Sequence, residues 1–313
     1  MLRILISSDL DEKYVARIRS HVPAGQVVKS AEMSILLTAI SDADILLAGR
    51  LTREMFLRAT RLKWIQTEAT GVDRFLFPEL VSSDVVLTNA RGAHAAPVSD
   101  HALAMILSFS RSLHRFTRFQ FDRRWKKLHC DELQYRTIGI VGLGSIGLEI
   151  ARKAACFGMK IVALDRNVQK PTFVEELYQP TDLHRLLERS DFVVLAVPLT
   201  LESEGMIGEE ELLKMKKSAV LINISRGRLV REGALTKALK EGRIAGAGLD
   251  VFEEEPLPSR SELWDLENVI VTPHVAGATP HDWRRVCDIF CENLTRYLSN
   301  RTLVNVVDKN IGY

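Results

Sequence analysis

The sequence has few cysteines, and their spacing excludes the common cysteine-based sites. None of the four stands in a Cys-x-x-Cys pair or at the spacing of a zinc site, so no metal centre is expected. Cys287 and Cys291 are four residues apart in a segment with helical spacing, which predicts two thiols packed on one helix face rather than a disulfide. Reduced thiols are typical of a cytoplasmic protein, and we expect that location.

The sequence also lacks a long apolar run and a strong excess of charge. It contains no stretch of about 18 apolar residues, so no membrane-spanning helix is expected. The apolar start at residues 1–6 is too short for a secretory signal. A formal net charge of +2 gives no general attraction to nucleic acid or to a membrane surface. With 46% hydrophobic and 26% charged residues in 313 positions, the composition is that of a globular protein of about two domains.

Strand and helix patterns alternate along the chain. In the first part we expect strands at 3–7, 43–48, 62–66 and 85–88 and helices at 12–20 and 33–39. In the later part we expect strands at 137–141, 160–164, 192–197, 219–224, 244–249 and 269–272 and helices at 148–157, 182–188, 209–215, 231–240 and 281–299. Residues 97–121 are expected to form one long helix. Such alternation predicts an α/β fold with two doubly wound parallel-sheet domains.

The order of these elements predicts that one domain is inserted into the other. The inserted domain is expected at residues 93–280, and the other at residues 1–92 plus 281–313. Crossings near residues 92 and 280 are expected to form a hinge. A cleft between the domains is the expected ligand site.

Residues 137–165 contain the full pattern of a dinucleotide-binding unit. A buried strand is followed by Gly142, Gly144 and Gly147, then by helical spacing, a second strand and a terminal acid, Asp165. The first glycine permits the tight turn, the second lets the backbone approach a pyrophosphate, and the third lets helix and strand pack closely. The helix N-terminus then favours negative charge. The glycine triplet alone is equally typical of a plain turn, but the whole pattern favours dinucleotide binding.

The residues after the second strand favour NAD and leave NADP open. The carboxylate of Asp165, about 20 residues after the glycines, is able to accept hydrogen bonds from an adenosine ribose and would repel a 2′-phosphate. Arg166 follows it directly and is able to receive that phosphate. NADP therefore stays the alternative cofactor.

Polar segments follow three of the later strands, at the edge where parallel sheets bind ligands. Reduction of a 2-keto acid needs a cation for the carboxylate, an acid for the carbonyl oxygen, and a carboxylate that orients the acid and favours its charged form. Arg226, His274 and Glu255 are the candidates for these roles. Each alone has a structural alternative: a surface arginine, a structural histidine and a solvated acidic loop. Their joint placement after successive strands favours the catalytic interpretation.

These segments resemble the D-isomer-specific 2-hydroxyacid dehydrogenases over essentially the whole chain. The segments that carry the resemblance are residues 141–147, 197–200, 223–227, 248–256 and 272–279. The resemblance implies a Rossmann-type nucleotide domain inserted into a flavodoxin-like substrate domain. It also implies that Arg226 binds the substrate, that Glu255 partners the histidine, that His274 is the acid/base, and that Asp250 contacts the carboxamide side of the nicotinamide.

The resemblance extends the list of expected contacts. The expected cofactor contacts are Gly142, Gly144, Ser145, Ile146, Gly147, Asp165, Arg166, Pro198, Thr200, Ser225, Asp250 and His274. The expected substrate contacts are Arg50, Thr70, Gly71, Val72, Arg226 and His274. A plain helix-entry turn is the alternative for residues 70–72, a solvated arginine is an equal alternative for Arg50, and His101 is interpreted as structural. Glu68 is unusual beside an anionic ligand, yet a small keto acid such as glyoxylate or hydroxypyruvate remains the expected substrate.

Two further interpretations concern partners. Residues 111–127 interleave arginines and lysines with aromatic side chains, a pattern that nucleic-acid-binding segments also show. An amphipathic helix at a homodimer interface is the favoured interpretation, and the family resemblance points the same way. A corepressor-like NAD(H) sensor without turnover is the alternative to an enzyme, and oxidation of NADH by 2-keto acids distinguishes the two.

Overall fold

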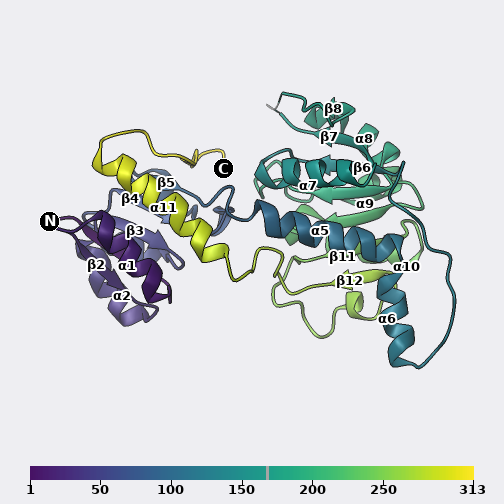
Figure 1. Cartoon of the computed structure of the whole chain (residues 1–313), viewed down its shortest axis with the longest axis horizontal. Coiled ribbons are helices and arrows are strands. Elements are labelled where there is room, and N and C mark those ends of the chain that lie inside the picture. The colour runs from purple at the N-terminus through teal and green to yellow at the C-terminus, as the bar shows by residue number, and fades with distance from the viewer. Residues whose placement is uncertain (167–168) are drawn as a thin grey trace. The chain divides into compact units, whose positions relative to one another are not determined.

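The computed structural model describes residues 1–166 and 169–313, which form two compact units (Figure 1). Unit 1 comprises Met1–His94 and Thr279–Tyr313, and unit 2 comprises Ala95–Ala278. Both ends of the chain therefore belong to unit 1, and unit 2 is a continuous insertion in its sequence.

Unit 1 is built on a parallel sheet with the strand order β2-β1-β3-β4-β5 in the described part of the chain. Its strands are β1 (Arg3–Ile6), β2 (Gln26–Lys29), β3 (Ile45–Ala48), β4 (Trp64–Thr67) and β5 (Val86–Thr88). This is the flavodoxin-like order. Strands β3 and β4 are buried at every position, whereas β2, at the edge, is partly exposed and was not predicted.

Helices cover both faces of this sheet. They are α1 (Glu12–His21), α2 (Met33–Ala39), α3 (Arg53–Arg58), α4 (Pro78–Val81) and α11 (Asp282–Leu298). Because successive strand residues face opposite sides, Ile4 packs in a cluster with α1 and α11, whereas Leu5 packs with Met55 of α3. Trp64 stacks on Phe290 of α11 with ring centroids 5.1 Å apart, which fixes the C-terminal helix on the sheet.

Unit 2 is built on a second parallel sheet, ordered β12-β11-β10-β9-β6-β7-β8 among the described residues. Its strands are β6 (Thr137–Val141), β7 (Lys160–Leu164), β8 (Glu176–Tyr178), β9 (Phe192–Leu195), β10 (Val220–Asn223), β11 (Gly246–Leu249) and β12 (Val269–Val271). The chain runs outward from β6 to one edge and from β9 to the other. The strand order therefore reverses between β6 and β9, and ligands of such sheets bind beside this point, at the carboxyl ends of the strands. The prediction of two doubly wound parallel sheets is confirmed.

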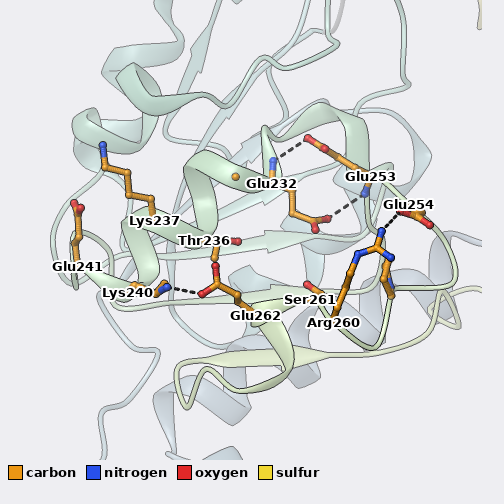
Figure 2. Close-up of a pocket in the computed structure, with 12 residues that line it drawn as sticks. Glu232, Thr236, Lys237, Lys240, Glu241, Glu253, Glu254, Arg260, Ser261 and Glu262 are labelled. Carbon is orange, nitrogen blue, oxygen red and sulfur yellow. Dashed lines mark hydrogen bonds and ion pairs between the residues drawn. The ribbon is translucent and has the colours of Figure 1, made fainter.

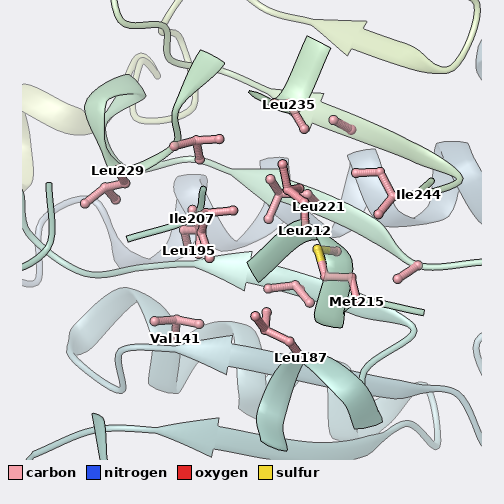
Figure 3. Close-up of a cluster of buried hydrophobic side chains, with 14 of the residues drawn as sticks. Val141, Leu187, Leu195, Ile207, Leu212, Met215, Leu221, Leu229, Leu235 and Ile244 are labelled. Atoms are coloured by element: carbon pink, nitrogen blue, oxygen red, sulfur yellow. The ribbon is translucent and has the colours of Figure 1, made fainter. Parts of the chain in front are cut away.

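Two hydrophobic cores hold the second sheet between helices. The helices are α5 (Ala95–Ser110), α7 (Ser145–Cys156), α8 (Leu183–Arg189), α9 (Glu209–Lys214) and α10 (Glu232–Lys240). Val141 and Leu221 point into the core with α8, α9 and α10 (Figure 3), whereas their neighbours Ile140 and Ile222 point into the core with α5 and α7. Each buried leucine or isoleucine contributes ~1.5–3 kcal/mol. This two-sided burial makes the sheet a firm base for the loops at its edge.

The prediction of one long helix over residues 97–121 is wrong. The segment forms α5 and then α6 (Leu113–Phe121), with Ser112 between them in the left-handed region at φ 53°. The hydroxyl of Ser110 donates to the backbone oxygen of Asp131 at 2.9 Å, and the N–H of Ser112 donates to Phe109 O at 3.1 Å. Serines compete in this way for backbone partners and favour helix ends.

Short 3-10 helices span Ile40–Asp42, Asp73–Phe75, Pro180–Asp182, Gly227–Leu229 and Glu262–Trp264. Within residues 1–166 and 169–313, every helix is too short or too polar to cross a membrane. Cys287 and Cys291 are buried free thiols on α11, as predicted.

Candidate active site

Four chemically distinctive segments follow strands of unit 2 at one edge of its sheet. His274 follows β12, Glu255 follows β11, Arg226 follows β10, and Gly142 follows β6. Together with β9 these parallel strands are consecutive in the sheet, so their carboxyl ends share one edge. The sheet thus brings to one edge the histidine, glutamate, arginine and glycine loop that the sequence analysis assigned to one site.

The side chains of His274 and Glu255 form a hydrogen bond. Nδ1 of His274 lies 2.7 Å from Oε2 of Glu255. Since a carboxylate only accepts, Nδ1 carries the hydrogen, and Nε2 is the nitrogen turned away from Glu255. The other oxygen of Glu255 accepts from the N–H of Phe252 at 3.1 Å. The histidine and glutamate side chains are 43% and 35% exposed, so the imidazole is oriented and still accessible.

The loop that carries Glu255 is fastened to α10 by two reciprocal hydrogen bonds. The N–H of Glu232 donates to Oε1 of Glu253 at 2.8 Å, and the N–H of Glu253 donates to Oε2 of Glu232 at 3.3 Å (Figure 2). Burial raises the pKa of Glu232, and repulsion by Glu253 and Glu254 acts in the same direction. The loop is therefore held by its own backbone and by α10.

A hollow of about 680 Å³, lined mostly by charged and polar residues, lies beside α10 and this loop (Figure 2). Two ion pairs join side chains of its lining: Lys240 with Glu262, and Arg260 with Glu254 at 3.7 Å. Its lining residues lie within 232–262 and do not include the His274 pair or Arg226 in the part of the chain described. The hollow is thus separate from the strand-end site.

His274 stands in a strained turn that Asp250 holds. Its φ of 53° lies in the left-handed region, which residues other than glycine rarely adopt. The N–H of His274 donates to the backbone oxygen of Asp250 at 2.8 Å. The amides of Val275 and Ala276 donate to the Asp250 carboxylate at 3.0 and 2.9 Å. Asp250 is only 1% exposed, so these bonds replace water around a buried carboxylate and fix the turn.

Arg226 is presented by a turn after β10. The amide of Asn223 donates to the backbone oxygen of Arg226 at 2.9 Å, and its side-chain oxygen accepts from the N–H of Ser225 at 3.2 Å. A Cβ on Gly227 would lie 1.8 Å from the carbonyl carbon of Phe252. Only glycine permits this approach, which packs the arginine turn against the loop after β11.

The glycine loop between β6 and α7 fits a dinucleotide. Gly142 has a φ of 98°, and a Cβ on Gly147 would lie 1.9 Å from its backbone oxygen. At Gly144, by contrast, no atom of the described residues other than its chain neighbours lies within 4 Å of the Cβ position. Ser145 and Ile146 begin α7, and the structure gives its N-terminus no side-chain cap within the described chain. Close packing at two glycines and open space at the third suit backbone binding of a pyrophosphate.

Asp165 and Arg166 follow β7 at the next strand end. Oδ2 of Asp165 accepts from the N–H of Leu143 at 2.7 Å, which ties the acid to the glycine loop. Arg166 forms an ion pair with Glu202. The predicted ribose acid therefore lies at the glycine loop, and the arginine next to it has an acidic partner.

Pro198, Thr200 and Ser225 lie on adjacent strand ends. The hydroxyl of Ser225 donates to the backbone oxygen of Val197 at 2.7 Å. The N–H of Thr200 donates to Oγ of Ser203 at 2.8 Å, and Ser203 donates to the backbone oxygen of Pro198 at 2.7 Å. Ser203, which the sequence analysis did not select, thus closes the loop after β9.

The remaining predicted substrate residues lie in unit 1. Arg50 follows β3, and Thr70, Gly71 and Val72 follow β4, so all four lie at the carboxyl edge of the unit 1 sheet. Oγ1 of Thr70 lies 3.2 Å from Nδ1 of His94. Burial lowers the pKa of His94, which favours a neutral imidazole beside this loop.

Comparison with known proteins identifies the family. A family model described as "D-isomer specific 2-hydroxyacid dehydrogenase, NAD binding domain" matches residues 103–276. Glyoxylate reductases of Korarchaeum cryptofilum and Thermococcus onnurineus are 36% and 37% identical to the chain, and each alignment covers 99% of this chain and 96% of the relative. The chain belongs to the D-isomer specific 2-hydroxyacid dehydrogenase family. This confirms the predicted enzyme class.

Solved structures similar to this dehydrogenase support its assignment to the family. A D-isomer specific 2-hydroxyacid dehydrogenase family protein from Aeromonas salmonicida is 31% identical, with a TM-score of 0.89 over 98% of this chain and 99% of that chain. The NADPH-dependent glyoxylate/hydroxypyruvate reductase from Sinorhizobium meliloti, in complex with NADP and sulfate, is 29% identical, with a TM-score of 0.89 over 100% of both chains. The predicted cofactor class, NAD(P), is confirmed.

The burial of Glu68 in the dehydrogenase was not predicted from the sequence, which marked this residue only as unusual beside an anionic ligand. Oε2 of Glu68 and Oγ of Ser8 are buried without a hydrogen-bond partner among the described residues. Burial raises the pKa of Glu68 to about 7; the charge of Asp282 adds to this shift, and Arg74 opposes it. A Cβ on Gly49 would lie 2.7 Å from Oε2 of Glu68. Sequence spacing gives no signal for this burial, because it depends on three strand ends of unit 1.

Proposed function

We propose that the dehydrogenase reduces a small 2-keto acid to the D-2-hydroxy acid with NAD(P)H, and that glyoxylate or hydroxypyruvate is its preferred substrate. The observation that carries the proposal is the placement of Arg226, Glu255 and His274 at the sheet edge that also holds the glycine loop. The choice of substrate is supported by curated relatives named glyoxylate reductase, among them that of Pyrococcus furiosus at 39% identity over 88% of this chain.

His274 acts as the acid. Its Nδ1 is held by Glu255 at 2.7 Å, so Nε2 is the atom that donates a proton to the carbonyl oxygen. The guanidinium of Arg226 pairs with the carboxylate of the substrate, because its planar fork matches that group. A bound NAD(P)H supplies the hydride that reaches the carbonyl carbon. Hydride and proton together convert the carbonyl to a hydroxyl, and the neutral imidazole regains its proton from solvent.

The other predicted residues receive supporting roles in the proposal. The cofactor contacts assigned are Gly142, Gly144, Ser145, Ile146, Gly147, Asp165, Arg166, Pro198, Thr200, Ser225, Asp250 and His274. In unit 1, Arg50 and the backbone amides of Thr70, Gly71 and Val72 are assigned to the substrate carboxylate. The carboxylate of Asp250 also accepts bonds within the His274 turn, so its contribution to the cofactor site includes holding that turn.

The proposal includes a preference for NADH over NADPH. Asp165 stands at the end of β7 with its carboxylate at the glycine loop, where it would repel a 2′-phosphate. Arg166 is paired with Glu202, which offsets the charge that would attract that phosphate. A kcat/KM for NADPH above that for NADH would contradict this preference.

The proposal also includes a homodimer formed through α6 and the segment that follows it. Every residue of α6 is partly or fully exposed, and Phe121 and Trp125 are 81% and 97% exposed. Aromatic side chains exposed together on a monomer typically mark an interaction surface. We expect a cytoplasmic location, supported by the free thiols of all four cysteines in the described chain.

The test is the oxidation of NADH and NADPH by a panel of 2-keto acids, followed by the loss of reduced-nicotinamide absorbance. We expect turnover of roughly 1–1000 per second with glyoxylate or hydroxypyruvate. Arg226→Lys should raise the KM for the keto acid and leave the Kd for NADH unchanged, because lysine keeps the charge but loses the fork. Binding of NADH without turnover of any keto acid would support a nucleotide sensor instead.

A further inference from the structure

A hydrogen-bond chain in unit 2 connects helix α5 to the turn that carries His274. Nε2 of His101, on α5, lies 2.9 Å from Oγ1 of Thr272. The hydroxyl of Thr272 donates to Oδ1 of Asp250 at 2.6 Å. A hydroxyl has one hydrogen, and this bond uses it, so His101 must donate from Nε2 to the threonine oxygen. The direction of every bond in the chain is thereby fixed.

The hydrogen-bond chain includes residues on both sides of His274 in the sequence: Thr272 before it, and Val275 and Ala276 after it. Asp250 receives the Thr272 hydroxyl and the amides of Val275 and Ala276 on its carboxylate, and its backbone oxygen receives the amide of His274. These bonds hold His274 at a φ of 53°. Left-handed backbone at a histidine costs of order 1 kcal/mol and persists only where its surroundings hold it.

His101 supplies the outermost donor of this chain. Nε2 also lies 3.6 Å from Oδ1 of Asp250, so the imidazole faces the same buried carboxylate that binds the turn. Its side chain is 22% exposed, and the carboxylate side chain 1%. In a chain of hydrogen bonds each bond polarises the next, so loss of the His101 donor weakens the bond from the Thr272 hydroxyl to the buried carboxylate of Asp250.

We propose that His101 is a positioning residue for the reduction, acting through Thr272 and Asp250 on the turn that presents His274. The proposal rests on the role of His274 under the proposed function. His101 donates to Thr272, Thr272 to Asp250, and Asp250 fixes the amides that follow His274. Because these hydrogen bonds hold the turn of the acid and not the glycine loop, their loss lowers kcat by more than it weakens NADH binding, to which Asp250 also contributes under the proposed function.

The experiment compares His101→Leu, which removes the donor, with His101→Gln, whose amide nitrogen replaces Nε2. We expect kcat to fall about tenfold in the leucine variant and to stay within about twofold of wild type in the glutamine variant. Thr272→Val, which removes the direct donor to Asp250, should be at least as slow as His101→Leu. The double variant should be no slower than Thr272→Val, since both substitutions break the same hydrogen-bond chain. Asp100→Asn, at the neighbouring position of α5 and paired with Lys153, is the matched control.

Amide hydrogen exchange provides a readout that does not depend on turnover. The amides of Val275 and Ala276 should exchange about tenfold faster in His101→Leu, and at the wild-type rate in His101→Gln. Unchanged exchange or unchanged kcat in His101→Leu, or equal impairment of the leucine and glutamine variants, would overturn the proposal. If the wild-type protein reduces no 2-keto acid, the proposed function fails, while exchange still decides whether His101 holds the turn.

Discussion

Replacement of Gly144 by alanine tests the cofactor site without disturbing the fold. Its φ of −65° is open to any residue, and a Cβ there meets no atom of the described residues within 4 Å. The same Cβ would stand where a pyrophosphate approaches the backbone. Gly144→Ala should therefore fold normally and bind NADH poorly.

The expected loss follows from the bonds that a displaced pyrophosphate gives up. A hydrogen bond to a charged group contributes about 1.5–3 kcal/mol, so one such bond lost weakens binding about 10- to 100-fold. The assay is the Kd for NADH from protein fluorescence, beside the thermal midpoint of the same sample. An NADH affinity equal to that of wild type would refute the assignment of the glycine loop.

Two other glycines are matched controls. A Cβ on Gly147 would lie 1.9 Å from a backbone oxygen, so Gly147→Ala should lower the thermal midpoint, since overpacking costs about 1–3 kcal/mol. A Cβ on Gly233 in α10 meets nothing within 4 Å in the described chain. Gly233→Ala should stabilise the helix by about 0.5–1 kcal/mol and leave NADH binding unchanged.

Three further predictions concern charge and assembly. Glu202→Gln should raise the kcat/KM ratio of NADPH to NADH by up to about fivefold, because Arg166 loses an exposed acidic partner; an unchanged ratio would separate Arg166 from cofactor choice. Burial raises the pKa of Glu68 to about 7, so the wild type loses stability as pH rises from about 5 through 7. Glu68→Gln should match wild type near pH 5 and exceed it by about 2 kcal/mol near pH 8, as followed by chemical unfolding; parallel pH curves would contradict this. Replacement of Phe121 and Trp125 by serine should shift sedimentation from dimer to monomer, and a wild type already monomeric would refute the interface.

The parts of the fold that sequence predicted are those with strong local patterns. The strands β3, β6 and β10 were predicted because each contains a run of at least three buried residues without a charged or amide side chain. The two missed strands, β2 and β8, lie at the sheet edges, are short and are partly exposed, so their apolar pattern is weak. The break in the helix near Ser112 depends on a bond from Ser110 to a residue 21 positions away, which local spacing does not reveal.

The residues of the candidate site divide in the same way, into those that local motifs predicted and those that they did not. The glycine loop and the strand-end positions of Arg226, Glu255 and His274 follow from motifs that are local in sequence, and the strand order places them at one edge. The bond between His101 and Thr272 joins residues 171 positions apart, and the burial of Glu68 depends on three strand ends. Neither is visible as a spacing along the chain.

The proposed mechanism requires His274 to donate the proton during reduction of the keto acid. Its most direct test is His274→Ala, with turnover of glyoxylate and the Kd for NADH measured on the same preparation. We expect kcat to fall about 100- to 10,000-fold while NADH still binds through the glycine loop, which the substitution leaves intact. Turnover close to that of wild type would contradict it.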